Sequence, residues 1–290
     1  MELSSKKQRV ACLIAITFLL FFSLAGAAGV TEKRLIAFCG SASKPVLEEA
    51  AERFYKETGI RVDLNLGGSG TMLSQMKLAR RGDLYIPGSP DYMVKAIRDG
   101  IVDRDSAAIL AYLIIAIDVQ HGNPKHIKTL SDLAKPGMRV AIGNPEAVCV
   151  GLYAVEVLER IGLLTKVQKN IVTHAPSCEA TAALVAMKKV DAVIGWDVFS
   201  KWNPKKIDTI LLKPHEIPRI AYIPAAVSTY SQDKKGAQKF IDFLASPAGQ
   251  KIFAKWGYIA TEKEARRFAP KAEIGGEYKL PVNYTLSVQK

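Results

Sequence analysis

The sequence predicts an α/β protein of two lobes, each a sheet flanked by helices, with a cleft between them. Strand-like and helix-like segments alternate from residue 33 onward and fall into two sets. Two long apolar segments, 107–119 and 219–227, follow the first and second sets and are expected to cross between the lobes. Alternation of strands and helices builds parallel sheets covered by helices, so each set predicts one lobe.

The first set of segments is regular. Segment 34–38 is short and apolar, as in a buried strand, and 44–59 has apolar residues at helical spacing before a closing glycine. The set continues as strand 61–67, helix 71–82, strand 83–89 and helix 90–100. Pro90 stands at the first turn of the last of these helices, where proline is favoured.

The second set predicts strand 139–143, helix 151–162, strand 170–175, helix 178–190 and strand 191–196. Two closing helices follow within 234–258, separated at Ser246-Pro247. We therefore predict one lobe from 33–113 with 221–262, a second lobe from 114–220, and a polar C-terminal tail, 263–290, that carries little pattern.

The N-terminus predicts export. A basic stretch at 6–9 precedes an uncharged apolar run at 10–30 that contains Ala25-Gly26-Ala27, which is typical of an export signal, here 1–28. The run is nearly long enough to span a bilayer, so an uncleaved N-terminal anchor is the alternative. We expect an exported protein, periplasmic or extracytoplasmic. The net charge of +12 comes from scattered lysines and arginines without interleaved aromatics, which does not favour nucleic acid as a partner.

Four strand-to-helix joints combine glycine with serine or threonine. They are 39–43, 67–71, 143–151 and 175–181. Ligands of open α/β sheets bind beyond the carboxyl ends of the strands, where a helix start offers free N–H groups and a positive dipole end to an anion. Serine and threonine at such positions also serve as ordinary N-caps. No P-loop and no GxGxxG pattern is present, so the joints do not predict a nucleotide site.

The sequence contains no recognisable catalytic motif. It has no GxSxG elbow, no HExxH and no spaced CxxC, and its four histidines form no ligand-spaced pair. Asp197 and Glu179 are isolated carboxylates. We predict that the protein is not an enzyme and needs no cofactor. An exported enzyme acting on a small anion is a further hypothesis, without a motif in its favour.

The chain resembles the periplasmic molybdate- and tungstate-binding proteins, the solute receptors of oxyanion ABC importers. The resemblance covers about 34–260 and rests on the order of "FCGSASKPVLEEAAERFYKETG", "GGSGTMLSQM", "GDLYIPGSPDYM", "GNPEAVCVGLYAVEVLERIG", "KKVDAVIGWD" and "SPAGQKIFAKWGY". It implies a type II periplasmic-binding-protein fold with two mixed sheets and an interlobe cleft. It also implies molybdate or tungstate as ligand and a membrane ABC permease as partner. We expect a monomer.

The resemblance places the ligand-binding groups residue by residue. They are serine hydroxyls and backbone donors of the joints, at Ser41, Ser69, Val150 and Ala180, with Ser43 and Gly70 beside the two serines. The indole N–H of Trp196 is added as a candidate from this chain's own sequence. Bacterial members of the family usually carry a tyrosine where this chain has Ile194, and Trp196 is the nearest aromatic residue. Archaeal members add two carboxylates to the ligand shell, for which only Glu146 and Glu179 lie nearby.

The cysteines allow an alternative function. Cys39, Cys149 and Cys178 each lie in one of the joints. They fit three interpretations: small buried residues, a Cys149–Cys178 disulfide formed after export with Cys39 left over, or a three-thiolate site for a soft metal or metalloid ion. The last would replace oxyanion binding, because thiolates repel a dianion.

Overall fold

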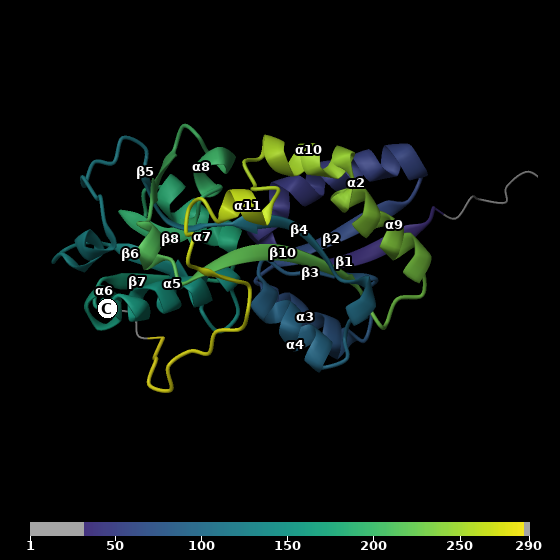
Figure 1. Ribbon diagram of the computed structural model, residues 1–290, viewed down its shortest axis with the longest axis horizontal. Helices are drawn as coiled ribbons and strands as arrows, with labels where there is room; N and C mark the ends of the chain where they lie inside the picture. Colours follow the sequence, from purple (N-terminus) through teal and green to yellow (C-terminus); the bar gives the residue numbers. More distant parts are fainter. Residues whose placement is uncertain (1–31, 287–290) are drawn as a thin grey trace, which may run out of the picture. The chain divides into compact units, whose positions relative to one another are not determined.

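The computed structural model describes residues 32–286 of the chain. The expected export signal or anchor, 1–28, lies outside the described residues. Residues 34–286 belong to one compact unit, which holds two mixed sheets (Figure 1). No helix in the described part is long and apolar enough to cross a membrane.

The first sheet has the strand order β11-β10-β3-β1-β2, with β4 paired to β10. Strands β1 to β3 are parallel to one another, and β10 is antiparallel to both β3 and β4. The strands are β1 (Arg34–Gly40), β2 (Arg61–Gly67), β3 (Leu84–Ile86), β4 (Ala108–Leu113), β10 (Arg219–Val227) and β11 (Glu273–Ile274). The helices associated with this sheet are α2 (Lys44–Thr58), α3 (Ser69–Ala79), α4 (Pro90–Arg98), α9 (Lys234–Ala245), α10 (Pro247–Lys255) and α11 (Glu262–Ala265). These elements are the first lobe.

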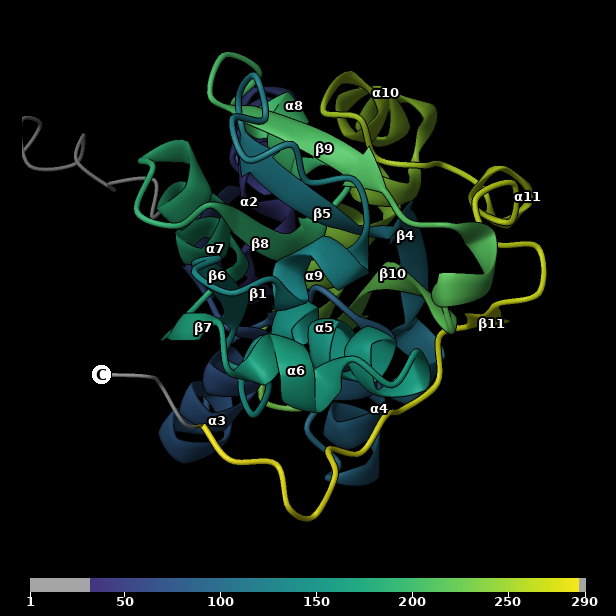
Figure 2. The same cartoon turned by 90° about the vertical axis from the view of Figure 1, so that its left-hand side faces the viewer.

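The second sheet has the order β7-β6-β8-β5-β9, in which β5 is antiparallel to its two neighbours. Its strands are β5 (Ile115–Gln120), β6 (Val140–Gly143), β7 (Ile171–Ala175), β8 (Ala192–Trp196) and β9 (Ile207–Leu211). Its helices are α5 (Cys149–Arg160), α6 (Leu164–Gln168), α7 (Cys178–Ala186) and α8 (Phe199–Trp202). These elements are the second lobe, which faces the viewer in Figure 2. Short 3₁₀ turns occupy 41–43, 104–106, 130–134 and 214–216.

The predicted α/β class with two mixed sheets is confirmed. Segment 107–119 crosses between the lobes as predicted, and it does so as two strands of different sheets that break at Ile114. The Ile114 amide donates to the Asp197 carboxylate (3.0 Å), and the Asp197 amide donates to the Ile114 carbonyl (2.9 Å). Both backbone hydrogen-bonding groups of Ile114 are therefore satisfied by Asp197 at the point where the chain passes from one lobe to the other.

Local sequence explains how the helices begin and end. Helix α2 has a proline in its first turn and ends at Gly59 in the left-handed conformation (φ 70°). The two closing helices are separated at Ser246, whose side chain accepts a hydrogen bond from the amide of Gly249, as predicted for Ser246-Pro247. The tail has more structure than expected, because it contains part of α11 and adds β11 to the edge of the first sheet. The predicted residue boundaries of the lobes stay a prediction.

Candidate functional site

The carboxyl ends of β1, β2 and β3 lie side by side, so the joints that follow them are neighbours. Gly40 pairs with Gly67, and Cys39 pairs with Ile86. A side chain added at Gly40 would come within 2.6 Å of the Ser69 hydroxyl oxygen and 2.5 Å of the Gly88 nitrogen. Glycine is required there because the three chain segments approach so closely. The first lobe thus gathers Ser41, Ser69 and Gly88.

The serine hydroxyls of this group keep a proton to donate. The Ser69 hydroxyl oxygen accepts a hydrogen bond from the Gly88 amide (3.0 Å), and that of Ser41 accepts one from the Glu179 amide in the second lobe (3.2 Å). Both serines are buried, with 1% of their surface exposed. Because an accepting hydroxyl still carries one O–H donor, each can bind a further acceptor.

The second lobe contributes the start of α5. The backbone N–H groups of Cys149 and Val150 donate to no group among residues 32–286. Both residues are buried, and α5 has 12 residues, so its start also presents the positive end of a helix dipole. Open amides of this kind bind anions. The position predicted at Val150 therefore has a free donor.

Trp196, at the end of β8, supplies a further free donor. Its side chain is fully buried, and its indole N–H has no hydrogen-bond partner within the described chain. It lies beside the Cys149 thiol, as does the Ser69 hydroxyl. A buried N–H without a partner costs free energy, which a ligand that accepts its hydrogen bond would recover.

Two of the three cysteines meet in the same place. The sulfur atoms of Cys149 and Cys178 are 3.4 Å apart, and all three cysteines are free and buried. Burial, together with the neighbouring Cys178 sulfur, raises the pKa of Cys149 well above its usual value, although Ser69 and Trp196 oppose this shift. Burial also raises the pKa of Cys39. Thiols with raised pKa values stay protonated, so Cys149 presents an S–H group rather than a repelling thiolate.

The cysteine interpretations fare differently. Cys149 and Cys178 are not joined by a disulfide in this structure. No three His, Cys, Asp or Glu side chains among the described residues are grouped so that they could hold a metal ion. The three-thiolate pocket is therefore not formed here. All three cysteines are buried, as the interpretation of them as small buried residues predicts.

Three of the predicted donors are already engaged within the protein. The Ser43 hydroxyl donates to the Gly40 carbonyl (3.3 Å), and the Gly70 amide donates to the Ala147 carbonyl in the second lobe (2.8 Å). The Ala180 amide donates to the Ser177 side chain (3.0 Å), which caps α7. The expectation of a ligand donor at Ala180 is therefore corrected, because an ordinary N-cap consumes that amide.

The remaining sequence candidates are not donors to this site. Ile194 is buried in β8 opposite Ile117 and brings no polar group. The Glu179 carboxylate forms an ion pair with Lys44 of the first lobe. Gly88 is a site residue that sequence analysis missed, although "PGSP" at 87–90 carries the same glycine–serine signal before a helix. The lobes are in contact around these residues, through Gly70 and Ala147 and through Ser41 and Glu179.

Comparison with known proteins identifies the family. Residues 35–259 match the bacterial extracellular solute-binding proteins. The chain belongs to this family. It is 25% identical to the molybdate-binding protein ModA of Escherichia coli over 82% of this chain and 94% of ModA. It is also 25% identical to a sulfate-binding protein of Synechococcus elongatus, over 75% of this chain and 69% of that protein.

Solved structures agree on the fold of this solute-binding protein. The periplasmic molybdate-binding protein of Azotobacter vinelandii superposes with a TM-score of 0.69 at 22% identity, covering 79% of this chain and all of that one. The resemblance predicted from the sequence is thereby confirmed, as is the type II fold. The family consists of extracytoplasmic solute receptors rather than enzymes, and its relatives place oxyanions among the ligands to be tested.

Proposed function

We propose that this protein captures a tetrahedral oxyanion, molybdate or tungstate first, between its lobes and delivers it to an ABC permease in the membrane. The observation that carries the proposal is the set of uncommitted donors at one place. The hydroxyls of Ser41 and Ser69, the amides of Cys149 and Val150, and the indole of Trp196 all have a hydrogen to donate. Oriented donors from several chain segments suit an anion with four oxygen acceptors.

The donor set is neutral, which fits binding without a counter-cation. Lys44, a basic side chain that follows Ser43 and bonds across the lobes, is already paired with Glu179. Helix starts and hydroxyls stabilise an anion through partial charges, and they do so most strongly where water is excluded. The protein would act as a monomer and hold no resident cofactor. The same donors could also bind sulfate or phosphate, so the specificity among these anions has to be measured.

Serine variants test the proposal. Ser41→Ala and Ser69→Ala each remove one hydroxyl that has a free proton, and each should weaken molybdate binding about tenfold to a hundredfold, as for a hydrogen bond to a charged partner. Ser43→Ala is the matched control, because its hydroxyl already donates to Gly40 and should leave the affinity nearly unchanged. Isothermal titration measures all three. Equal affinities in the three variants would refute the assignment of these joints.

The soft-ion hypothesis keeps one supporting observation, the Cys149–Cys178 thiol pair. Two thiols can bind a soft ion only after losing their protons, which the raised pKa of Cys149 opposes. We therefore rank it second to oxyanion binding.

A further inference from the structure

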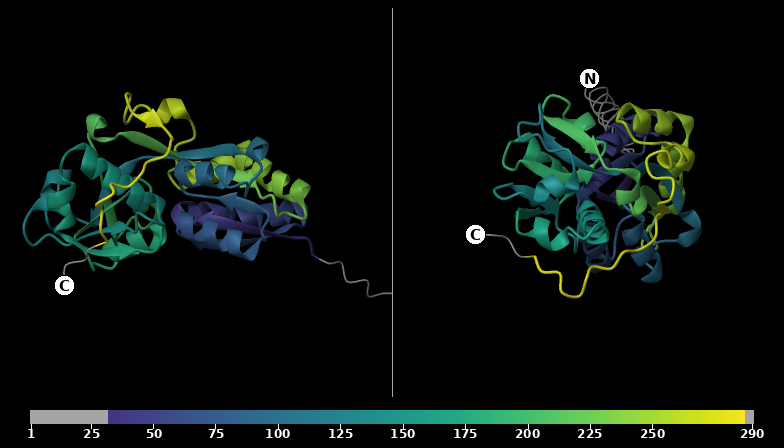
Figure 3. Two further views of the ribbon diagram at one scale, coloured as in Figure 1. Left: turned by 90° about the horizontal axis from the view of Figure 1, so that it is seen from below. Right: turned by 60° about the vertical axis from the view of Figure 1, so that its left-hand side comes forward.

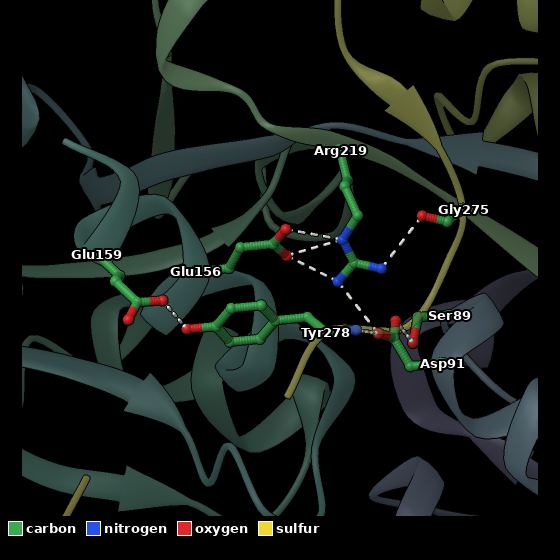
Figure 4. Close-up of polar contacts among 7 residues, drawn as sticks. All are labelled: Ser89, Asp91, Glu156, Glu159, Arg219, Gly275 and Tyr278. Atoms are coloured by element: carbon green, nitrogen blue, oxygen red, sulfur yellow. Dashed lines mark hydrogen bonds and ion pairs between the residues drawn. The ribbon is translucent and has the colours of Figure 1, made fainter. Parts of the chain in front are cut away.

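A buried guanidinium joins the two lobes at the start of β10. Arg219 donates to the Glu156 carboxylate of α5 from two of its nitrogens (2.8 and 2.7 Å), and it pairs with Asp91 of α4 at 3.1 Å (Figure 4). The three side chains are 5%, 11% and 4% exposed. Arg219 and Asp91 belong to the first lobe and Glu156 to the second. Separating the lobes would break the bidentate pair and expose both charges to water.

The C-terminal segment, residues 275–286, strengthens the same junction from outside. The Gly275 carbonyl accepts a hydrogen bond from Arg219 (3.2 Å), and the Tyr278 amide donates to Asp91 (2.9 Å). The Tyr278 hydroxyl reaches the other lobe and donates to the Glu159 carboxylate of α5. Figure 4 shows Tyr278 extending between the two carboxylates. One residue therefore bonds to both lobes.

Beyond Tyr278 the segment continues along the second lobe. The Tyr284 hydroxyl lies 3.2 Å from the His174 ring nitrogen in β7, and the Thr285 carbonyl accepts a hydrogen bond from Gln168 of α6 (2.9 Å). The segment leaves the first sheet at β11 and ends on the second lobe, as Figure 3 shows from below. His174 of the second lobe thus contacts the C-terminal segment.

Packing connects this junction to the ligand donors. The Arg219 guanidinium lies over the Tyr153 ring (4.4 Å to its centroid), and Tyr153 packs edge-on against Trp196 (5.1 Å between centroids). Asp91 also accepts a hydrogen bond from Ser89, which follows Gly88 in the chain. A single residue, Tyr153, therefore lies between Arg219, which holds the lobes together, and Trp196, which would bind the anion.

We propose that Arg219, Glu156 and the C-terminal segment form an interlobe latch that holds the closed state and slows ligand release without touching the ligand. This inference rests on the proposed function, in which the ligand lies between the lobes. The apparent affinity of a ligand that binds the closed state falls with the closed fraction, so weakening the latch weakens binding from a distance. The residues of the latch are positioning residues.

Two conservative variants test the latch. Glu156→Gln removes the charge across the lobes but leaves Arg219 paired with Asp91, and Tyr278→Phe removes the hydroxyl bonded to Glu159 but keeps the Tyr278 amide. The matched control is Glu57→Gln, which breaks an arginine–glutamate pair within α2 of a single lobe. The affinity for molybdate is measured by titration. The association and dissociation rates are measured by stopped-flow tryptophan fluorescence.

The latch predicts a dissociation rate that rises about tenfold in Glu156→Gln and about threefold in Tyr278→Phe, with an association rate that changes less than twofold. Glu57→Gln should match the wild type. A role limited to stability would lower the unfolding temperature and leave the dissociation rate unchanged. Wild-type dissociation rates in both latch variants would overturn the proposal.

Small-angle scattering of the ligand-free protein separates this proposal from the proposed function. The latch predicts a larger radius of gyration for the double variant Glu156→Gln/Tyr278→Phe than for the wild type and Glu57→Gln, whether or not any anion binds. Equal radii would overturn the latch even if molybdate binds tightly. A larger radius in a protein that binds none of the tested anions would support the latch and refute oxyanion capture.

Discussion

Replacing Gly68 by alanine should hold the lobes apart with little strain inside either lobe. Gly68 precedes α3 with φ −64° and ψ 137°, a conformation that alanine adopts readily. A β-carbon there would lie 2.8 Å from the Ala147 carbonyl oxygen, 2.9 Å from that of Pro176 and 3.1 Å from a Val148 methyl. These three neighbours all belong to the second lobe. The added methyl therefore opposes closure and little else.

The size of the effect follows from these contacts. Ordinary contact begins near 3.4 Å, so the two lobes must separate by about half an ångström around Gly68. Backbone oxygens cannot move aside as the end of a flexible side chain can. One extra methyl in a packed interface costs about 1–3 kcal/mol. If that cost falls on the closed, ligand-bound state, the dissociation constant for molybdate rises about 5-fold to 150-fold.

Isothermal titration with molybdate measures this change, and thermal unfolding checks that the lobes themselves remain folded. Gly67→Ala is the matched control, because its β-carbon would meet only the flexible end of Met72 in the same lobe, at 2.8 Å. Its affinity should stay near that of the wild type. Equal affinities for Gly68→Ala and the wild type would refute the argument, because the ligand would then not require this interface to close.

Two further predictions concern buried titratable groups. Burial raises the pKa of Asp197 to about 7 from its usual 3.8, so this residue favours the folded state below about pH 4, and its contribution is lost as the pH rises to about 7. The unfolding free energy of the wild type relative to Asp197→Asn should fall by up to about 4 kcal/mol over that interval in urea titrations, and a difference independent of pH would contradict this. The double variant Cys149→Ser/Cys178→Ser should bind molybdate within about threefold of the wild type, because thiols donate at most weak hydrogen bonds that hydroxyls replace. Loss of molybdate binding in a folded double variant would show that the sulfur atoms themselves hold the ligand.

Local signals in the sequence were enough to predict the fold class and part of the candidate site. The alternation of strands and helices is a pattern of neighbouring residues, and Ser41 and Ser69 follow glycines at strand ends. Gly88 follows the same rule and was within reach of sequence analysis. Ser177, three residues before Ala180, was also a readable N-cap signal, and it is the reason why the Ala180 amide is occupied.

Contacts between distant segments could not be predicted from one sequence. The break at Ile114 depends on Asp197, which lies 83 residues away. Strand β9 was overlooked because its edge position leaves a mixed pattern of exposure. Tyr278 contacts Asp91, which lies 187 residues away in the sequence, and Glu159, which lies 119 residues away. No pattern in the polar tail predicts either contact. Such pairings arise from packing, which periodicity does not encode.

The most direct test of the account is isothermal titration of the reduced protein, expressed without residues 1–28, with molybdate, tungstate, sulfate and phosphate. The donor set at Ser41, Ser69, Val150 and Trp196 predicts saturable one-to-one binding of at least one of these oxyanions, and the proposed ligand requires molybdate or tungstate to be among those bound. Absence of binding heat with all four anions, confirmed by unchanged thermal stability in their presence, would contradict oxyanion capture.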